Sequence, residues 1–97
     1  MVNMSKPVLR PFDAIKFLRD EGDMTSYLAA AFEEGDADLI RSALNDVARA
    51  RGMTALARDT GLTRETLYKA LGDKGNPTLT TLLAISKALG VKLSLAA

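Results

Sequence analysis

The sequence predicts an all-α protein, a small bundle of five to six helices that contains a helix-turn-helix. Apolar residues recur three and four positions apart along most of the 97 residues, which is the spacing of one helix face. Gly35, Gly52, Gly61 and Gly90 follow these periodic segments, as glycine does at helix C-termini. Alternation typical of a strand occurs only in residues 91–97, so the sequence allows one short C-terminal strand at most.

We divide the chain into residues 1–10 and a single helical domain of residues 11–97. Residues 1–10 are expected to be disordered, as chain ends often are. The domain should hold N-terminal helices in residues 11–35 and a helix-turn-helix core in residues 36–90.

The segment 11–35 predicts two helices. The first follows Pro11 and ends at the polar run RDEGD, and its apolar stripe contains Phe12, Ile15, Phe17 and Leu18. Asp23 is expected to cap the second helix, which runs to Gly35, because a carboxylate there can accept from unpaired backbone amides. The buried stripe of this second helix is Met24, Tyr27, Leu28, Ala31 and Phe32.

A third helix is predicted between Asp36, as its cap, and Gly52. We expect the apolar stripe of this helix to lie in the core. A last helix is predicted between Thr78 and Gly90, and we expect its apolar stripe to lie in the core too. These two stripes are Leu39, Ile40, Ala43, Leu44, Val47 and Ala48, and Leu79, Leu82, Leu83, Ile85, Ser86 and Leu89.

Two shorter helices lie between these long ones. Residues 54–60 form the first, and Gly61 ends it where a positive φ is favourable. Thr63 caps the second, which has Leu67 and either Ala70 or Leu71 on its inner face. The turn is therefore about three residues long. Asn76-Pro77 cannot lie in a helix interior and marks the loop before the last helix.

The composition argues against an enzyme. There is no cysteine and no histidine, so thiolate chemistry, disulfides and the commonest general base and metal ligand are all excluded. The pairs Glu33/Glu34 and Asp36/Asp38 could in principle serve as paired carboxylates for acid/base chemistry, but such close neighbours do not face each other on a helix. We expect no catalytic residue, metal or cofactor. Without an apolar run of export or membrane-spanning length, we expect a cytoplasmic protein.

Charge is divided unequally along the chain. Residues 1–50 have a net charge of −3 and residues 51–97 a net charge of +4. A basic half is expected where a protein displaces counterions from phosphates, and an acidic half suits a basic protein partner.

A helix-turn-helix places its second helix in the DNA major groove. Arginine near the start of that helix can bind guanine bidentately, and threonine can contact a thymine methyl group or a phosphate. Glu65 has two readings: it accepts from a cytosine amine, or it pairs with Arg64 or Lys69 on the surface. Tyr68 is read either as a DNA contact or as a packing residue. The candidate DNA-binding residues are Thr54, Thr63, Arg64, Glu65, Thr66, Tyr68, Lys69 and Lys74.

The run MTALARDTGLTRETLYKAL at 53–71, with GNPT at 75–78 and ISKALGV at 85–91, resembles the Cro/repressor (Xre-like) type of helix-turn-helix, which has a lambda-repressor-like fold. Residues 11–95 as a whole are similar to addiction-module antidote proteins, the antitoxins of the HigA type. One position departs from the pattern: the glutamine that often contacts phosphate in the wider group corresponds to Met53.

The resemblance implies an antitoxin of a type II toxin-antitoxin system. Such proteins neutralise a small basic RNase toxin of the RelE/ParE superfamily and act in transcriptional regulation as dimeric repressors of their own promoter. It implies that Ala57 and Gly61 are the small helix residue and the turn glycine of the motif, and that Arg64 through Lys69 face DNA. The partners would be operator DNA, the toxin and a second copy of the chain.

Two alternatives remain open from the sequence. The protein could be a free-standing helix-turn-helix transcriptional regulator without a toxin partner, or its main function could be toxin binding alone. For a homodimer, the tail with Val91, Leu93 and Leu95 is the first candidate interface, and the last helix is the second.

Overall fold

The structure is a computed structural model, and it describes residues 15–96. Residues 15–17 lie in a helix that precedes the others. Five further helices follow: α2 (Glu21–Glu34), α3 (Ala37–Arg51), α4 (Met53–Thr60), α5 (Arg64–Leu71) and α6 (Leu79–Leu89). The predicted all-α bundle of five to six helices is confirmed. The predictions for residues 1–10 and for the beginning of the first helix lie outside the described residues.

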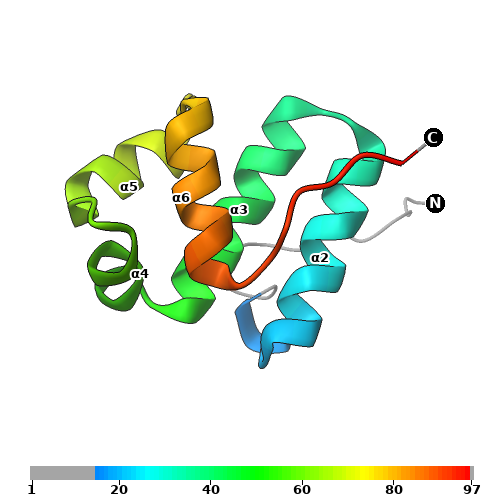
Figure 1. Cartoon of the computed structure of the whole chain (residues 1–97), viewed down its shortest axis with the longest axis horizontal. Helices are drawn as coiled ribbons and strands as arrows, with labels where there is room; N and C mark the ends of the chain where they lie inside the picture. The colour runs from blue at the N-terminus through cyan, green and yellow to red at the C-terminus, as the bar shows by residue number, and fades with distance from the viewer. Residues whose placement is uncertain (1–14, 97) are drawn as a thin grey trace, which may run out of the picture.

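The helices form two groups that meet at α6 (Figure 1). On one side α2 and α3 run antiparallel, and on the other the short helices α4 and α5 follow each other. One core joins all five helices, because each contributes buried residues to the same cluster. Its largest fully buried side chains are Leu44, Leu56, Leu67, Leu71, Ile85 and Val47.

Most helix ends follow from local chemistry as predicted. Asp36, Thr63 and Thr78 are the N-caps of α3, α5 and α6, and each side chain accepts a hydrogen bond from a backbone amide of the first turn. Gly35 and Gly61 end α2 and α4 in the left-handed conformation, with φ of 71° and 78°, which glycine adopts without steric cost.

The predicted cap of α2 at Asp23 is wrong. Asp20 is the N-cap, and its Oδ1 accepts from the Asp23 amide at 2.8 Å. Asp23 lies one turn into the helix, where its Oδ2 accepts from the Arg19 amide at 3.1 Å. The first turn of α2 is polar, so its apolar periodicity begins three residues after the helix does.

Three leucines and a phenylalanine that we expected on buried stripes are exposed: Leu39, Leu79, Leu83 and Phe17. The prediction is correct for the buried members Leu44, Val47 and Ile85. In α6 the reason is that apolar residues occur on more than one side of the helix. Only the side that carries Ile85 and Leu89 faces the core, so the leucines of the other side remain in solvent.

The C-terminal strand that the sequence allowed does not form among the described residues. Residues 91–96 are an extended segment that passes in front of α2 in Figure 1. The Val91 amide donates to the Ser86 carbonyl at 3.0 Å, but the backbone of residues 92–96 forms no hydrogen bond with the described chain. The physical reason is that no second strand lies beside the segment to pair with it.

A buried hydrogen bond connects α2 to α3. Tyr27 Oη donates to Asp46 Oδ2 at 2.5 Å, and Asp46 is only 4% exposed. Burial raises the pKa of Asp46, although the Tyr27 hydrogen bond and the charge of Arg49 act in the opposite direction. Burial also raises the pKa of Tyr27, reinforced by its hydrogen bond to Asp46. Asp46 Oδ1 has no hydrogen-bond partner among the described residues, so no hydrogen bond there compensates for the burial of this oxygen.

Asp46→Asn is expected to remove a pH dependence from the stability of the protein. The folded-state pKa of Asp46 lies above its unfolded value, so its contribution is fully present below a pH of about 4 and is lost as the pH rises through the folded pKa. Urea denaturation of both proteins between acid and neutral pH should therefore show the variant gaining stability relative to the parent as the pH rises. Asp73→Asn, at an exposed position, serves as the control.

A constant difference between Asp46→Asn and the parent across this pH range would contradict a raised pKa for Asp46. The Asp73→Asn difference should stay flat in either case.

Candidate nucleic-acid interface

The α4–α5 pair is built around a three-residue turn, as predicted. The Gly61 amide donates to the Ala57 carbonyl at 2.9 Å and ends α4. Thr60 Oγ1 then accepts from the Leu62 amide at 3.2 Å, which holds the turn. Thr63 begins α5 immediately afterwards. The turn fixes the direction in which α5 leaves α4.

Buried leucines attach α5 to the core on one side only. Leu67 and Leu71 are fully buried, one turn apart, and Leu56 of α4 is fully buried in the same core cluster. The other side of α5 is polar and in solvent. This arrangement fixes the helix on the surface without covering its outer face.

Arg41 of α3 holds the C-terminal end of α5. Its Nη1 donates to the carbonyls of Leu71 and Gly72 at 2.9 and 2.8 Å, which are among the carbonyls that a helix C-terminus leaves unpaired. A guanidinium charge is also favourable at the negative end of the helix dipole. The Arg41 Nε lies 3.5 Å from Asp38 Oδ1. This role could not be predicted from the sequence, because thirty residues separate Arg41 from Leu71 and no local pattern links them.

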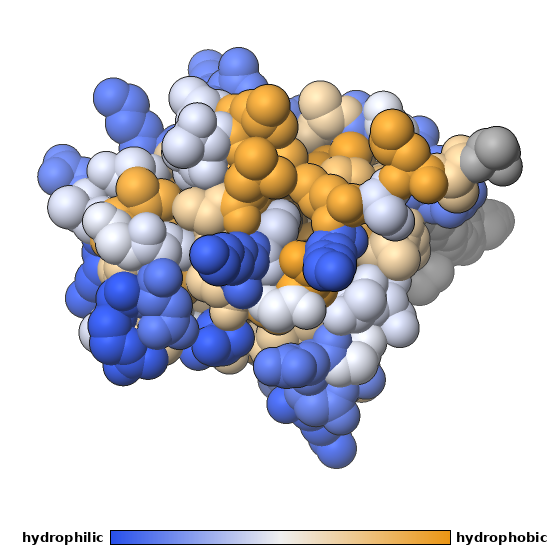
Figure 2. Space-filling view, in the orientation of Figure 1, coloured by the Kyte–Doolittle hydropathy of each residue, from blue (hydrophilic) through white to orange (hydrophobic). Residues whose placement is uncertain are grey.

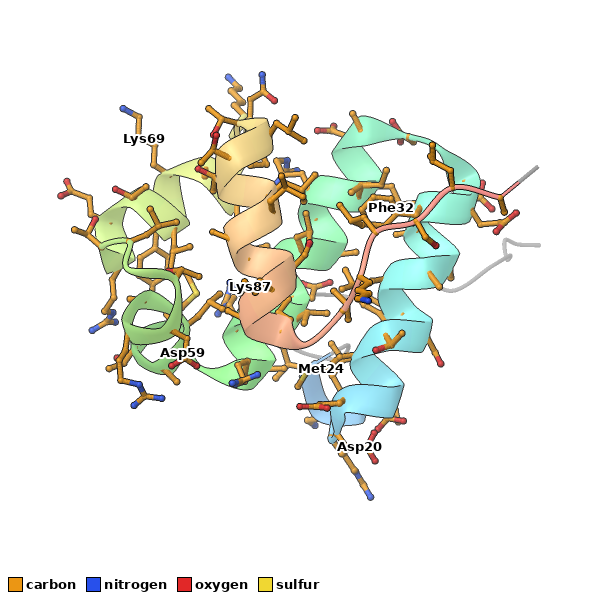
Figure 3. All side chains as sticks on the ribbon, in the orientation of Figure 1. Asp20, Met24, Phe32, Asp59, Lys69 and Lys87 are labelled. Atoms are coloured by element: carbon orange, nitrogen blue, oxygen red, sulfur yellow. The ribbon has the colours of Figure 1, made fainter. Side chains whose placement is uncertain are left out.

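The candidate DNA-binding residues of α5 are brought together on its exposed side. Arg64, Glu65, Thr66, Tyr68 and Lys69 are all exposed, and Thr63 is exposed at the cap. In Figure 3 the labelled Lys69 points away from the body of the protein. Two further candidates belong to other elements: Thr54 lies in the first turn of α4, and Lys74 lies in the loop after α5.

Arg64 and Tyr68 contact each other across one turn of α5. The Arg64 Nη2 donates to Tyr68 Oη at 3.3 Å, and the guanidinium carbon lies 5.8 Å from the centre of the ring. Tyr68 is 47% exposed, so it belongs to the outer surface of the helix. The contact orients the guanidinium on the exposed side of the helix.

Glu65 forms no ion pair with Arg64 or Lys69 within residues 15–96. Its carboxylate is therefore available as an acceptor, and the cationic groups of Arg64 and Lys69 are not neutralised by it. Thr66 is partly engaged: its amide donates to Thr63 Oγ1 at 3.0 Å, and its own Oγ1 accepts from Thr63 Oγ1 at 2.8 Å. The hydroxyl hydrogen of Thr66 is left for another acceptor.

Met53 is buried at the start of α4, with 7% exposure. This position holds a phosphate-contacting glutamine in many proteins that the sequence resembles, but here the side chain packs in the core. Contact with phosphate by this side chain is therefore excluded, and α4 has no side-chain cap at its N-terminus.

The structure offers no metal-binding arrangement among residues 15–96. No three acidic side chains there come together in a way that could hold a metal ion. None of the described helices is long and apolar enough to cross a membrane. The exposed polar side of α5 is the best-defined candidate site in this part of the chain.

Comparison with known proteins gives one family and one relative. A family model described as "Probable addiction module antidote protein" matches residues 8–97, so the similarity extends over all of the described helices. An uncharacterized protein of Haemophilus influenzae is 45% identical over 84 residues, which cover 87% of this chain and 87% of that protein. No solved structure shows significant similarity to the chain.

Arg41→Met should destabilise the protein by about 1.5–3 kcal/mol, since methionine keeps most of the apolar stem and loses the charged donors to the α5 carbonyls. Urea denaturation measures the loss. Arg19→Ala is the control, because the Arg19 side chain is exposed and should change the free energy of unfolding by less than about 0.5 kcal/mol. Equal stabilities of Arg41→Met and Arg19→Ala would rule out the anchoring role of Arg41.

Proposed function

This chain belongs to the family of probable addiction module antidote proteins, and from that premise we propose that it is the antitoxin of a type II toxin-antitoxin module that also binds its own promoter. An antidote requires a toxin to neutralise, so the family implies a toxin partner. The proposed partner is a small basic RNase toxin of the RelE/ParE type. The proposed DNA reader is the α4–α5 pair, acting as a helix-turn-helix of the Xre-like kind in a HigA-type antitoxin.

The observation that carries the DNA-binding proposal is the uncovered side of α5. Its inner side is fixed by Leu67 and Leu71, while Arg64 and Lys69 remain exposed and have no carboxylate partner within residues 15–96. A short helix held in this way can enter a major groove, where arginine is the commonest specific reader of guanine. The positive charge of residues 51–97 supports the same proposal.

The observation that supports a basic protein partner is the acidic character of α2. Glu21, Glu33 and Glu34 are exposed on this helix, and no ion pair joins them to the described chain. The labelled Asp20 at the start of α2 and Lys69 on α5 lie at opposite ends of the molecule in Figure 3. We therefore place toxin binding and DNA binding on different surfaces, which would allow both at once.

A free-standing regulator is the second candidate function, because the DNA-binding features of α5 do not depend on a toxin. The neighbouring reading frame discriminates between the two. A basic product of about 100 residues encoded beside this chain supports the antitoxin, and its absence supports the free-standing regulator.

The main test is a titration of the protein against its own upstream DNA and a scrambled duplex at two salt concentrations. We expect the upstream DNA to bind at least about a thousandfold more tightly, with affinity falling steeply as salt rises. Equal and weak binding to both duplexes would contradict the DNA-binding proposal and leave α5 as a scaffold helix.

Arg64→Ala should weaken binding to the upstream DNA by about 1–3 kcal/mol, because a bidentate contact to guanine would be lost. The same titration measures it. Arg19→Ala removes the same charge from an exposed position near the start of α2 and should change affinity little. A loss of only a few tenths of a kcal/mol for Arg64→Ala would refute a base contact by Arg64.

The single variants Glu21→Lys and Glu34→Lys should each slow association with the toxin, since electrostatic attraction acts mainly on the association rate. Surface plasmon resonance with the purified toxin measures both rates, and the dissociation rate should change less. Glu65→Lys on α5 is the matched reversal and should leave the toxin association rate unchanged. Similar slowing by all of these reversals would show that net charge, and not the α2 surface, governs association.

A further inference from the structure

Tyr68, on the outer side of α5, makes contacts that neither of its two sequence-based interpretations accounts for. Those interpretations were a DNA contact and a packing residue. Tyr68 follows Arg64 by four residues, so the two side chains lie one above the other on the same face of the helix. The phenol of Tyr68 lies outside the core cluster of the described chain and is directed to Arg64 instead.

The phenol contacts the Arg64 guanidinium in two ways at once. Arg64 Nη2 donates a hydrogen bond to Tyr68 Oη at 3.3 Å, and Arg64 Cζ lies 5.8 Å from the centre of the Tyr68 ring. The distance from this carbon to the ring centre is within the range of a cation–π interaction. Two contacts restrict the rotation of a planar guanidinium more than either of them does alone.

Within residues 15–96, Tyr68 is the side chain that holds the Arg64 guanidinium. No ion pair joins Arg64 to a carboxylate there, and Glu65, as the next residue along the helix, does not face it. Figure 2 shows a mainly hydrophilic surface over α4 and α5, whereas hydrophobic residues gather over α6 and the C-terminal segment. A long side chain in hydrophilic surroundings samples many rotamers unless a neighbour restricts it, and Tyr68 is that neighbour.

An arginine that reads a base has to hold one orientation. Ordering a flexible side chain during binding lowers affinity by about twofold to tenfold. A neighbour that orders the arginine before DNA arrives removes part of this loss. Tyrosine suits this task, because a rigid ring with two χ angles loses little conformational entropy itself.

The contact with Tyr68 leaves Arg64 able to bind a base. A guanidinium carries five N–H donors, and the hydrogen bond to Tyr68 uses one of them, which leaves four. A bidentate contact to guanine needs two donors. The ordering contact and a base contact can therefore exist together.

We propose that Tyr68 is a positioning residue: it holds the Arg64 guanidinium in the orientation that reads a base, and it contributes to sequence discrimination without contacting DNA. This inference rests on the proposed function, because it takes DNA as the ligand of Arg64. It concerns specificity more than overall affinity. Phosphates attract the charge of Arg64 in any orientation, whereas guanine accepts two hydrogen bonds only from an oriented guanidinium.

The test with DNA is a double-mutant cycle, in which the parent, Tyr68→Leu, Arg64→Ala and the double variant are titrated against the upstream DNA and the scrambled duplex. We expect Tyr68→Leu to weaken binding to the upstream DNA by about twofold to tenfold and to leave binding to the scrambled duplex unchanged. Tyr68→Phe keeps the ring and loses the hydroxyl, so it should lose less affinity than Tyr68→Leu does.

The Arg64→Ala background separates positioning from the other roles of Tyr68. Without the guanidinium there is nothing for Tyr68 to position, so Tyr68→Leu should then have no further effect on binding. A direct DNA contact by Tyr68, or a change in the fold of α5, would persist in this background. An equal loss in both backgrounds therefore overturns the positioning role, as does an equal loss on both duplexes.

A measurement on the free protein tests the contact without DNA. NMR relaxation gives an order parameter for the Nε–H bond of each arginine. The control is Arg19, an exposed arginine whose side chain forms no hydrogen bond or ion pair with the described chain. We expect the order parameter of Arg64 to exceed that of Arg19 in the parent and to fall to the Arg19 value in Tyr68→Leu.

Together the two measurements distinguish a failure of this inference from a failure of the proposed function. Selective binding to the upstream DNA with an Arg64 as mobile as Arg19 overturns the positioning role alone. Equal and weak binding of the parent to both duplexes contradicts the proposed function, and it overturns the base-reading role even where Arg64 is ordered. Selective binding, an ordered Arg64 and a loss confined to the Arg64-containing background support the inference.

Discussion

The eight residues of α5 are too few to remain helical in water by themselves, and the candidate DNA-binding surface depends on the contacts that compensate for this. The contacts act on three parts of the helix. Thr63 satisfies a free amide at the start, Leu67 and Leu71 attach the inner side to the core, and Arg41 accounts for two carbonyls at the end. Because all of these contacts lie at the ends or on the inner side, the outer side is left free for a ligand.

The small size of the domain explains why its remaining surfaces differ so strongly from one another. A chain of this length buries a smaller share of its surface than a larger domain does, so apolar residues are left outside the core. In α6 these are Leu79 and Leu83, on the side that faces away from Ile85. The acidic residues are concentrated on α2, and the cationic residues Arg64 and Lys69 on α5. Each surface therefore has its own chemistry and suits a different class of partner.

Local signals in the sequence were sufficient for the helices and their order. Threonine, aspartate and glycine determine helix ends through bonds to amides and carbonyls a few residues away, so Thr63, Thr78 and Gly61 could be recognised without tertiary information. Asp20 was missed because the apolar periodicity of α2 begins one turn after the helix. The exposed side of α5 could likewise be predicted, since the buried positions of Leu67 and Leu71 determine which residues face outward.

The features that sequence analysis could not supply all depend on contacts between distant parts of the chain. Arg41 and Leu71 are brought together by the packing of α3 against α5, and Tyr27 reaches Asp46 because α2 and α3 lie antiparallel. The exposure of Leu79 and Leu83 also depends on how distant parts of the chain pack. Helical spacing identifies a leucine-rich stripe, but only the position of the neighbouring helices decides which side of it is buried.

The candidate surfaces also differ in how many contacts within the described chain hold them in place. The outer side of α5 is rigidly fixed, and its chemistry follows from a few residues whose positions the core determines. The exposed leucines Leu93 and Leu95 are less constrained, because they belong to the segment 91–96, whose backbone beyond Val91 forms no hydrogen bond with the described chain. Since α6 carries the exposed Leu79 and Leu83 and also packs against α4, a partner that covers these leucines is one helix away from the α4–α5 pair.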